Sequence, residues 1–121
     1  MNKITAFCMI ALVFCAGTAF ANKSSVVISA PESAPKGSAV TITLTVSHNG
    51  NNWFHFTDWV YVKVNGAEVQ RWTFTRDTRP ESEVFTRQVT VTVDGPLSIE
   101  AESDCNVHGS AGVVKATIAP K

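Results

Sequence analysis

Val40-Thr41-Ile42-Thr43-Leu44-Thr45-Val46 decides the fold, because apolar and polar side chains alternate along it without a break. Successive side chains of a β-strand point to opposite faces, so the pattern predicts a strand with one aliphatic face and one threonine face. Similar short runs predict six further strands, at residues 25–29, 59–64, 69–74, 89–93, 97–101 and 113–118. The chain is therefore expected to be built from about seven strands.

Turn signals separate these runs. Asn65-Gly66 is a dipeptide typical of a tight hairpin, and Asp94-Gly95-Pro96 predicts a second turn. The five prolines all fall outside the expected strands, where a missing N–H costs little. With no convincing helical periodicity, the sequence predicts an all-β fold, an immunoglobulin-like antiparallel β-sandwich of about seven strands.

The N-terminal residues 1–21 have the features of a signal peptide. Lys3 precedes an apolar run, and Ala19-Phe20-Ala21 is a small-x-small cleavage motif before Asn22. The run is too short to span a bilayer comfortably. We therefore expect removal of residues 1–21, a mature domain at 22–121, no membrane span in the mature chain, and a periplasmic or secreted location.

The mature chain of about 100 residues is long enough for one modest core. The 10 basic and 10 acidic residues balance, and loss of Lys3 leaves a net charge of about −1. Because basic residues do not dominate, nucleic acid is not an expected partner. Composition alone thus indicates an exported globular domain and no particular activity.

Cys105 is the only cysteine after residue 21, and His108 follows it three positions later. The other two histidines, His48 and His55, flank a single predicted loop. Loops on a rigid sheet are common places for a functional site, and imidazole with thiolate suits a divalent transition metal. An ordinary alternative is a buried, inert thiol with histidines that are merely exposed. The placement of every histidine in these two loops favours a metal site.

The run Cys105-Asn106-Val107-His108-Gly109 resembles the Cys-Asn-x-His-Gly signature of the desulfoferrodoxin and neelaredoxin family, the superoxide reductases. The upstream segment from His48 to Val60 is similar to that family's segment with two histidines followed by an acidic residue and a tryptophan.

This resemblance implies a mononuclear non-haem iron, Fe²⁺ or Fe³⁺, with Cys105 as axial ligand and His48, His55 and His108 as equatorial ligands. Main-chain N–H groups of Val107 and His108 are expected to donate to the sulfur. The implied reaction is one-electron reduction of superoxide to hydrogen peroxide, which needs an electron-donor protein.

The chain departs from the family pattern in ways that leave alternatives open. The family's fourth equatorial histidine and a nearby lysine come from an N-terminal motif, but no histidine precedes His48 here. Water, a carboxylate such as Glu32, or a group from another subunit of a homo-oligomer would have to fill that position. Three imidazoles and a thiolate also suit a four-coordinate zinc or copper site.

A second resemblance gives another alternative. Residues 29–40, the histidine after the next strand, and the Val64-Asn65-Gly66 hairpin look similar to small sulfur-oxidation carrier subunits, which are binding modules without a metal. Those subunits lack the Cys-Asn-x-His-Gly signature, so the iron interpretation is preferred over a non-enzymatic metal-binding or carrier-like module.

Overall fold

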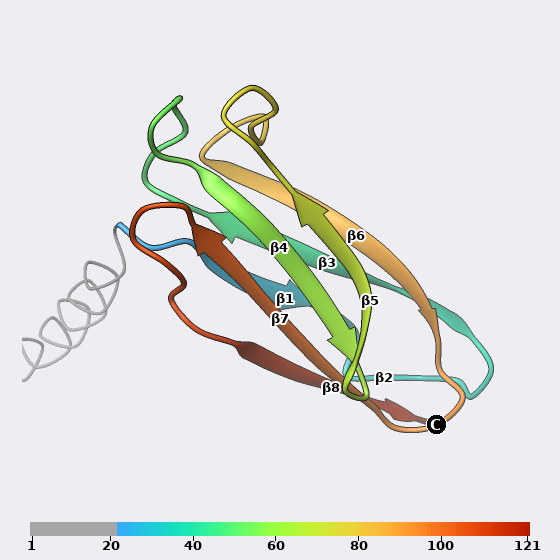
Figure 1. The fold of residues 1–121 in the computed structure, drawn as a ribbon. Helices are drawn as coiled ribbons and strands as arrows, with labels where there is room; N and C mark the ends of the chain where they lie inside the picture. The colour runs from blue at the N-terminus through green and yellow to red at the C-terminus, as the bar shows by residue number, and fades with distance from the viewer. Residues whose placement is uncertain (1–21) are drawn as a thin grey trace, which may run out of the picture.

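Two β-sheets pack face to face in the computed structural model, which describes residues 22–121 (Figure 1). The expected signal peptide at residues 1–21 lies outside the described residues. The first sheet contains β1 (Ser25–Ser29), β3 (Ala39–Ser47) and β6 (Val84–Thr92), in the order β1-β3-β6. Both of its pairings are antiparallel. The alternating stretch at 40–46 is thus the middle strand of this sheet, as its pattern predicts.

The second sheet has five strands in the order β2-β8-β7-β4-β5. They are β2 (Ser33–Ala34), β8 (Val114–Pro120), β7 (Leu97–Cys105), β4 (Thr57–Val64) and β5 (Ala67–Thr73). The short strand β2 was not among the strands expected from the sequence, and it pairs with β8 in parallel. The all-β sandwich is therefore confirmed, with one short parallel pairing added to an otherwise antiparallel fold.

The core lies between the two sheets and is almost wholly aliphatic. Ile42, Leu44 and Val46 of β3 are completely buried, and they face Val60 and Val62 of β4 across the sandwich. The alternating threonines of β3 are less buried than these aliphatic residues. Burying apolar surface is the main driving force for folding, so the alternation of β3 sets which face turns inward.

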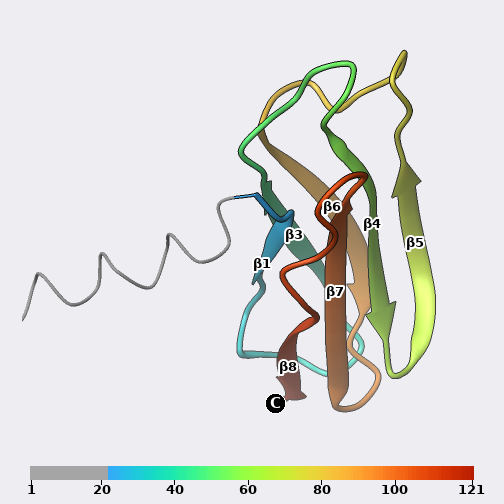
Figure 2. The same ribbon diagram turned by 60° about the vertical axis from the view of Figure 1, so that its left-hand side comes forward.

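One end of the sandwich gathers the features that matter for function. The β3–β4 loop, the β7–β8 loop and the beginning of the described chain all lie there (Figures 1 and 2). The strands are antiparallel, so β3 and β7 end where β4 begins. In residues 22–121, no helix is long and apolar enough to cross a membrane.

A β-bulge interrupts the pairing of β4 with β7 beside this end. Thr57 pairs with Cys105 and Trp59 with Asp104, which leaves Asp58 without a strand partner. Bulges of this kind often lie next to functional sites and redirect a side chain. Burial, followed by a hydrogen bond and charge repulsion from Asp104, raises the pKa of Asp58 to about 6. Asp58 therefore keeps its proton to a higher pH than an isolated carboxyl group would.

The Asp58→Asn variant should become more stable than the wild type as the pH rises. The pKa of Asp58 is higher in the folded state than in the unfolded state. The bound proton therefore stabilises the fold fully below about pH 4, and this stabilisation is lost as the pH rises past about 6. The asparagine side chain cannot ionise, so it does not lose this stabilisation at high pH. We expect a gain of about 1 kcal/mol at pH 8, after allowing for partial exposure of the pair, or roughly 4–8 °C in Tm.

Thermal unfolding of the metal-free protein at pH 4, 6 and 8 measures this effect. The exposed Asp77→Asn is the matched control and should follow the wild-type profile. An equal Tm for Asp58→Asn and wild type at pH 8 would show that ionisation of Asp58 does not destabilise the folded protein.

Candidate metal centre

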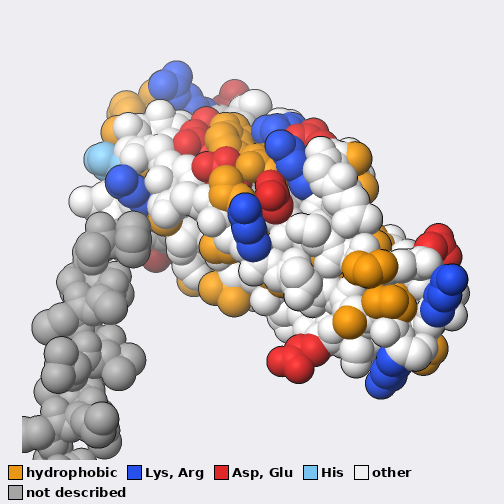
Figure 3. Space-filling model, turned by 90° about the horizontal axis from the view of Figure 1, so that it is seen from below, with side chains coloured by type: hydrophobic (Ala, Val, Ile, Leu, Met, Phe, Trp, Pro, Cys, Tyr) orange, Lys and Arg blue, Asp and Glu red, His pale blue; other side chains and the backbone are white. Residues whose placement is uncertain are grey.

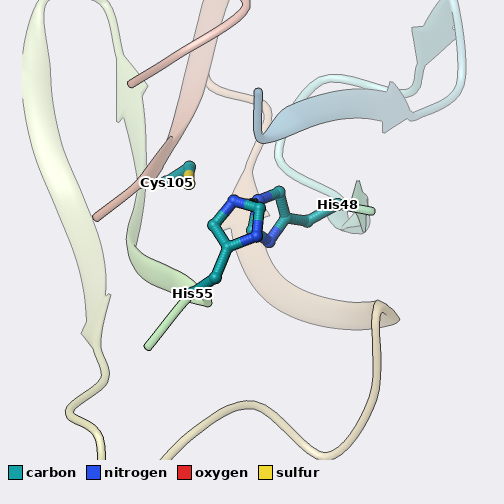
Figure 4. Close-up of side chains that lie close together, drawn as sticks. All are labelled: His48, His55 and Cys105. Carbon is teal, nitrogen blue, oxygen red and sulfur yellow. Dashed lines mark hydrogen bonds between the residues drawn. The ribbon is translucent and has the colours of Figure 1, made fainter. Parts of the chain in front are cut away.

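Two loops bring the four sequence-predicted residues together. His48 directly follows β3, and His55 lies two residues before β4 begins. Cys105 is the last residue of β7, and His108 lies in the turn that follows. Figure 4 shows the side chains of His48, His55 and Cys105 close together, although they come from three different segments.

The potential ligand atoms converge on one small volume. His55 Nε2 lies 3.1 Å from His48 Nε2 and 3.0 Å from His108 Nδ1. Ligand atoms of His48, His55 and Cys105 all lie within 4.8 Å of one another, as a shared metal ion requires. His108 does not belong to that three-residue group, but its Nδ1 lies 3.9 Å from the sulfur of Cys105.

Hydrogen bonds alone do not account for this arrangement. A neutral imidazole nitrogen offers either one N–H or one lone pair, yet His55 Nε2 has two nitrogen neighbours at short range. At most one of the two contacts can be a well-formed hydrogen bond. A cation placed between the rings would accept a lone pair from each nitrogen and relieve both contacts. The donor set therefore fits a metal ion.

The turn after β7 supports the thiol of Cys105. The N–H and C=O groups of Cys105 and Gly109 exchange hydrogen bonds of 2.9 and 3.0 Å, and Gly109 has a φ of 82° that favours glycine. Main-chain N–H groups of Val107 and His108 approach the sulfur at 3.4 and 3.3 Å. These two donors offset negative charge on a thiolate, as expected from the sequence. Cys105 is only 2% exposed.

Asn106 joins the two loops, a role that the sequence analysis did not identify. Its side-chain Oδ1 accepts a hydrogen bond of 2.9 Å from the Phe56 N–H, and its Nδ2 donates one of 3.0 Å to the Phe54 carbonyl. Its own N–H donates to the Phe56 carbonyl at 3.1 Å. The only feature of the sequence that could have indicated this role is the asparagine in the Cys-Asn-x-His-Gly motif. Through these bonds Asn106 fixes the distance between the segments that carry His55 and Cys105.

Gly50 makes room for His55. A β-carbon at residue 50 would lie 2.6 Å from His55 Nδ1, closer than real contacts allow. The φ of Gly50 is 144°, which L side chains rarely adopt. The loop is also held by Asn52, whose Oδ1 accepts hydrogen bonds from the N–H groups of Phe54 and His55. Glycine at residue 50 is therefore needed for the observed position of the His55 ring.

The three imidazoles differ in exposure. His48 is buried, His55 is half-buried and His108 is exposed. Burial, and then repulsion from His55, lowers the pKa of His48, so its ring is neutral and available as a ligand at pH 7. Its Nδ1 has no completed hydrogen bond, although main-chain groups of Gly50 and Asn22 lie near the ring. Small solutes can approach the cluster from the side of His108.

Glu32 does not belong to this site, which corrects the suggestion that it fills the vacant position. Its carbonyl accepts a hydrogen bond from the Ala119 N–H, beside the start of β7. Cys105 ends the same nine-residue strand, so the two ends are about 26 Å apart. The Pro31–Gly37 region lies at the opposite end of the sandwich because β1 runs antiparallel to β3.

Comparison with known proteins agrees with this geometry. The family model for desulfoferrodoxin matches residues 16–111. A superoxide reductase (neelaredoxin) from Ignicoccus hospitalis is similar in structure, with a TM-score of 0.69 and 19% identity over 82% of each chain. A Thermotoga maritima protein, whose assignment as a superoxide reductase is itself an inference, has a TM-score of 0.62 and 25% identity over 80% of this chain and 86% of its own.

A different kind of protein shares the same architecture. The CARDB domain of a Pyrococcus furiosus protein, solved in complex with di-metal ions, has a TM-score of 0.62 and 17% identity over 81% of this chain and 87% of that domain. No curated protein sequence matches this chain. The family match covers most of the chain, including every residue of the cluster, and the chain therefore belongs to the desulfoferrodoxin family.

Proposed function

We propose that residues 22–121 bind one mononuclear iron through His48, His55, His108 and Cys105 and reduce superoxide to hydrogen peroxide. The observation that carries this proposal is the convergence of three imidazole nitrogens and one thiol from two loops. Membership of the desulfoferrodoxin family, which binds mononuclear iron, supports iron as the metal.

Superoxide reduction requires one electron and two protons for each superoxide converted to hydrogen peroxide. A ferrous iron held by the cluster would supply the electron, and an electron-donor protein would have to restore it. The buried Cys105 thiolate would raise electron density at the metal, while the Val107 and His108 N–H groups moderate that effect. The exposed edge at His108 gives a small anion a way to the cluster.

The cellular setting is part of the same proposal. Residues 1–21 have signal-peptide features, so we place the mature domain in the periplasm or outside the cell. The protein would then react with superoxide outside the cytoplasm, and the electron-donor protein would have to be exported as well. A homo-oligomer remains an alternative in which a second subunit completes the metal site.

A non-enzymatic metal-binding module is the second candidate function. The observation in its favour is the shared architecture with the CARDB domain solved with di-metal ions. Such a module would hold a metal without cycling its oxidation state. The two candidates therefore differ in one measurable property, the reaction of the reduced protein with superoxide.

Rapid mixing of the ferrous protein with superoxide should oxidise the iron within the mixing experiment and yield hydrogen peroxide without evolution of oxygen. The Cys105→Ser variant should react far more slowly, because the serine oxygen donates less electron density. Zinc-loaded wild-type protein is the redox-inert control. Stopped-flow absorption, together with assays for peroxide and oxygen, follows the reaction. A ferrous protein that does not react would support the metal-binding module instead. Release of oxygen would show dismutation rather than reduction and would contradict the proposed reaction.

Gly50→Ala should weaken iron binding by about 10- to 100-fold, because the new methyl group displaces the His55 ring from its position. The variant also incurs backbone strain at a φ of 144°. Gly37→Ala is the matched control, since Gly37 has a φ of 87° but nothing within 4 Å of the added β-carbon.

Competition with a coloured ferrous chelator measures the affinities of both variants, and circular dichroism checks their folding. Weak binding by Gly50→Ala beside near-normal binding by Gly37→Ala is the expected result. Equal affinities for the two folded variants would contradict the placement of His55 in the metal site.

A further inference from the structure

The beginning of the described chain is fixed against the metal centre. Ser24 is completely buried, and its hydroxyl bonds to those of Thr57 and Ser103 at 2.9 and 2.8 Å. Its N–H donates to the Gly109 carbonyl at 3.3 Å, and its own carbonyl accepts from the Ala111 N–H at 2.9 Å. The chain before β1 is therefore held along the turn that follows β7 (Figures 1 and 2).

The chain before β1 passes between two of the candidate ligands. The Gly109 carbonyl accepts hydrogen bonds from the N–H groups of both Ser24 and Cys105. On the other side, β1 pairs with β3 so that Ser25 lies opposite Ser47, the residue before His48. Two residues of chain span at most about 7 Å, so the main-chain nitrogen of Asn22 stays close to the cluster. Figure 3 shows a histidine side chain at the surface near the point where the description of the chain begins.

Cleavage after Ala21 would change the chemistry of that nitrogen. Hydrolysis of the Ala21–Asn22 bond leaves a carboxylate on Ala21 and an amino group on Asn22. A peptide nitrogen has no available lone pair because of amide resonance, whereas a deprotonated amine is a good ligand for transition metals. The resemblance to the desulfoferrodoxin family implies four nitrogen ligands, and the chain holds only three histidines, so one nitrogen position would remain to be filled.

We propose that the α-amino group of Asn22, released by cleavage after Ala21, is the fourth nitrogen ligand of the metal. This inference rests on the proposed function and on the expected cleavage site. Ser24 already holds the chain in place, so the amine reaches the metal with little further loss of conformational entropy. Glu32 is excluded by its distance, and the exposed Lys23 would have to order a long, flexible side chain.

The test compares two forms of the mature protein. One begins at Asn22 with a free amine, and the other keeps Ala21, so that the nitrogen of Asn22 stays in a peptide bond. Titration with Fe²⁺ should show binding weaker by about tenfold or more in the form that keeps Ala21. Mass spectrometry of the exported protein should find Asn22 as the first residue.

Labelling separates the amine from other groups at the N-terminus. With ¹⁵N in the main-chain nitrogens of asparagine, electron–nuclear double resonance of the iron should show a coupled ¹⁵N in the free-amine form. The form that keeps Ala21 should lose that coupling. Asn22→Ala, which keeps a free but unlabelled amine, should lose the coupling and retain full affinity for Fe²⁺. Lys23→Ala should retain both the ¹⁵N coupling and the affinity for Fe²⁺.

The outcomes distinguish this inference from the proposed function. If both forms bind Fe²⁺ equally, or if the coupling is absent from the free-amine form, the amine is not a ligand and only this inference fails. A different first residue in the exported protein also overturns it. If neither form binds Fe²⁺, the proposed function fails as well. Loss of affinity for Fe²⁺ in Asn22→Ala would show that the side-chain amide of Asn22 binds the metal, and it would contradict the proposal that the α-amino group does so.

Discussion

The register between β4 and β7 is the constraint on which the metal centre depends. Pairing of Thr57 with Cys105 aligns the beginning of one strand with the end of the other. His55, two residues before Thr57, is thereby brought beside the turn that carries His108. A slip of one residue would turn Cys105 to the opposite face of the sheet and separate the ligands. Buried aliphatic residues along both strands hold this register, so the core of the sandwich also positions the site.

The cluster is an arrangement that a bound metal ion would stabilise. His55 Nε2 has two imidazole nitrogens at short range but only one N–H or one lone pair to offer them, and His48 is buried with an unpartnered Nδ1. Buried polar groups that lack partners destabilise the folded state. A metal ion that binds the folded chain would remove part of this cost and stabilise the domain by mass action. The bonds made by Asn106 and the space left by Gly50 are consistent with a site formed before the metal arrives.

Much of the fold could be predicted because the core strands follow simple alternation. β3 and β7 bury every second residue, a pattern visible in the sequence. β6 begins at Val84 rather than near Val89. Its burial alternates from Phe85 onward, but Arg87 occupies one of the inward positions and breaks the apolar alternation in the sequence. The short β2 was missed because two residues carry no periodicity.

The candidate ligands could be identified from their residue types and from the Cys-Asn-x-His-Gly signature. The residues that surround and position them could not be identified in this way. The suggestion of Glu32 was wrong because distance along the chain does not reveal which end of a sandwich a loop occupies. The proximity of Asn22 to His48 depends on the antiparallel pairing of β1 with β3, which places Ser25 opposite Ser47. The roles of Asn106 and Gly50 arise from contacts between loops, and a single sequence contains no direct signal for such contacts.

The most direct test of the central claim is X-ray absorption at the iron edge of the purified, iron-loaded mature protein. If His48, His55, His108 and Cys105 bind one iron, the spectrum should show a single sulfur neighbour, several imidazole nitrogens and a coordination number of five or six. A shell of light atoms without sulfur, or a four-coordinate tetrahedral site, would contradict the account.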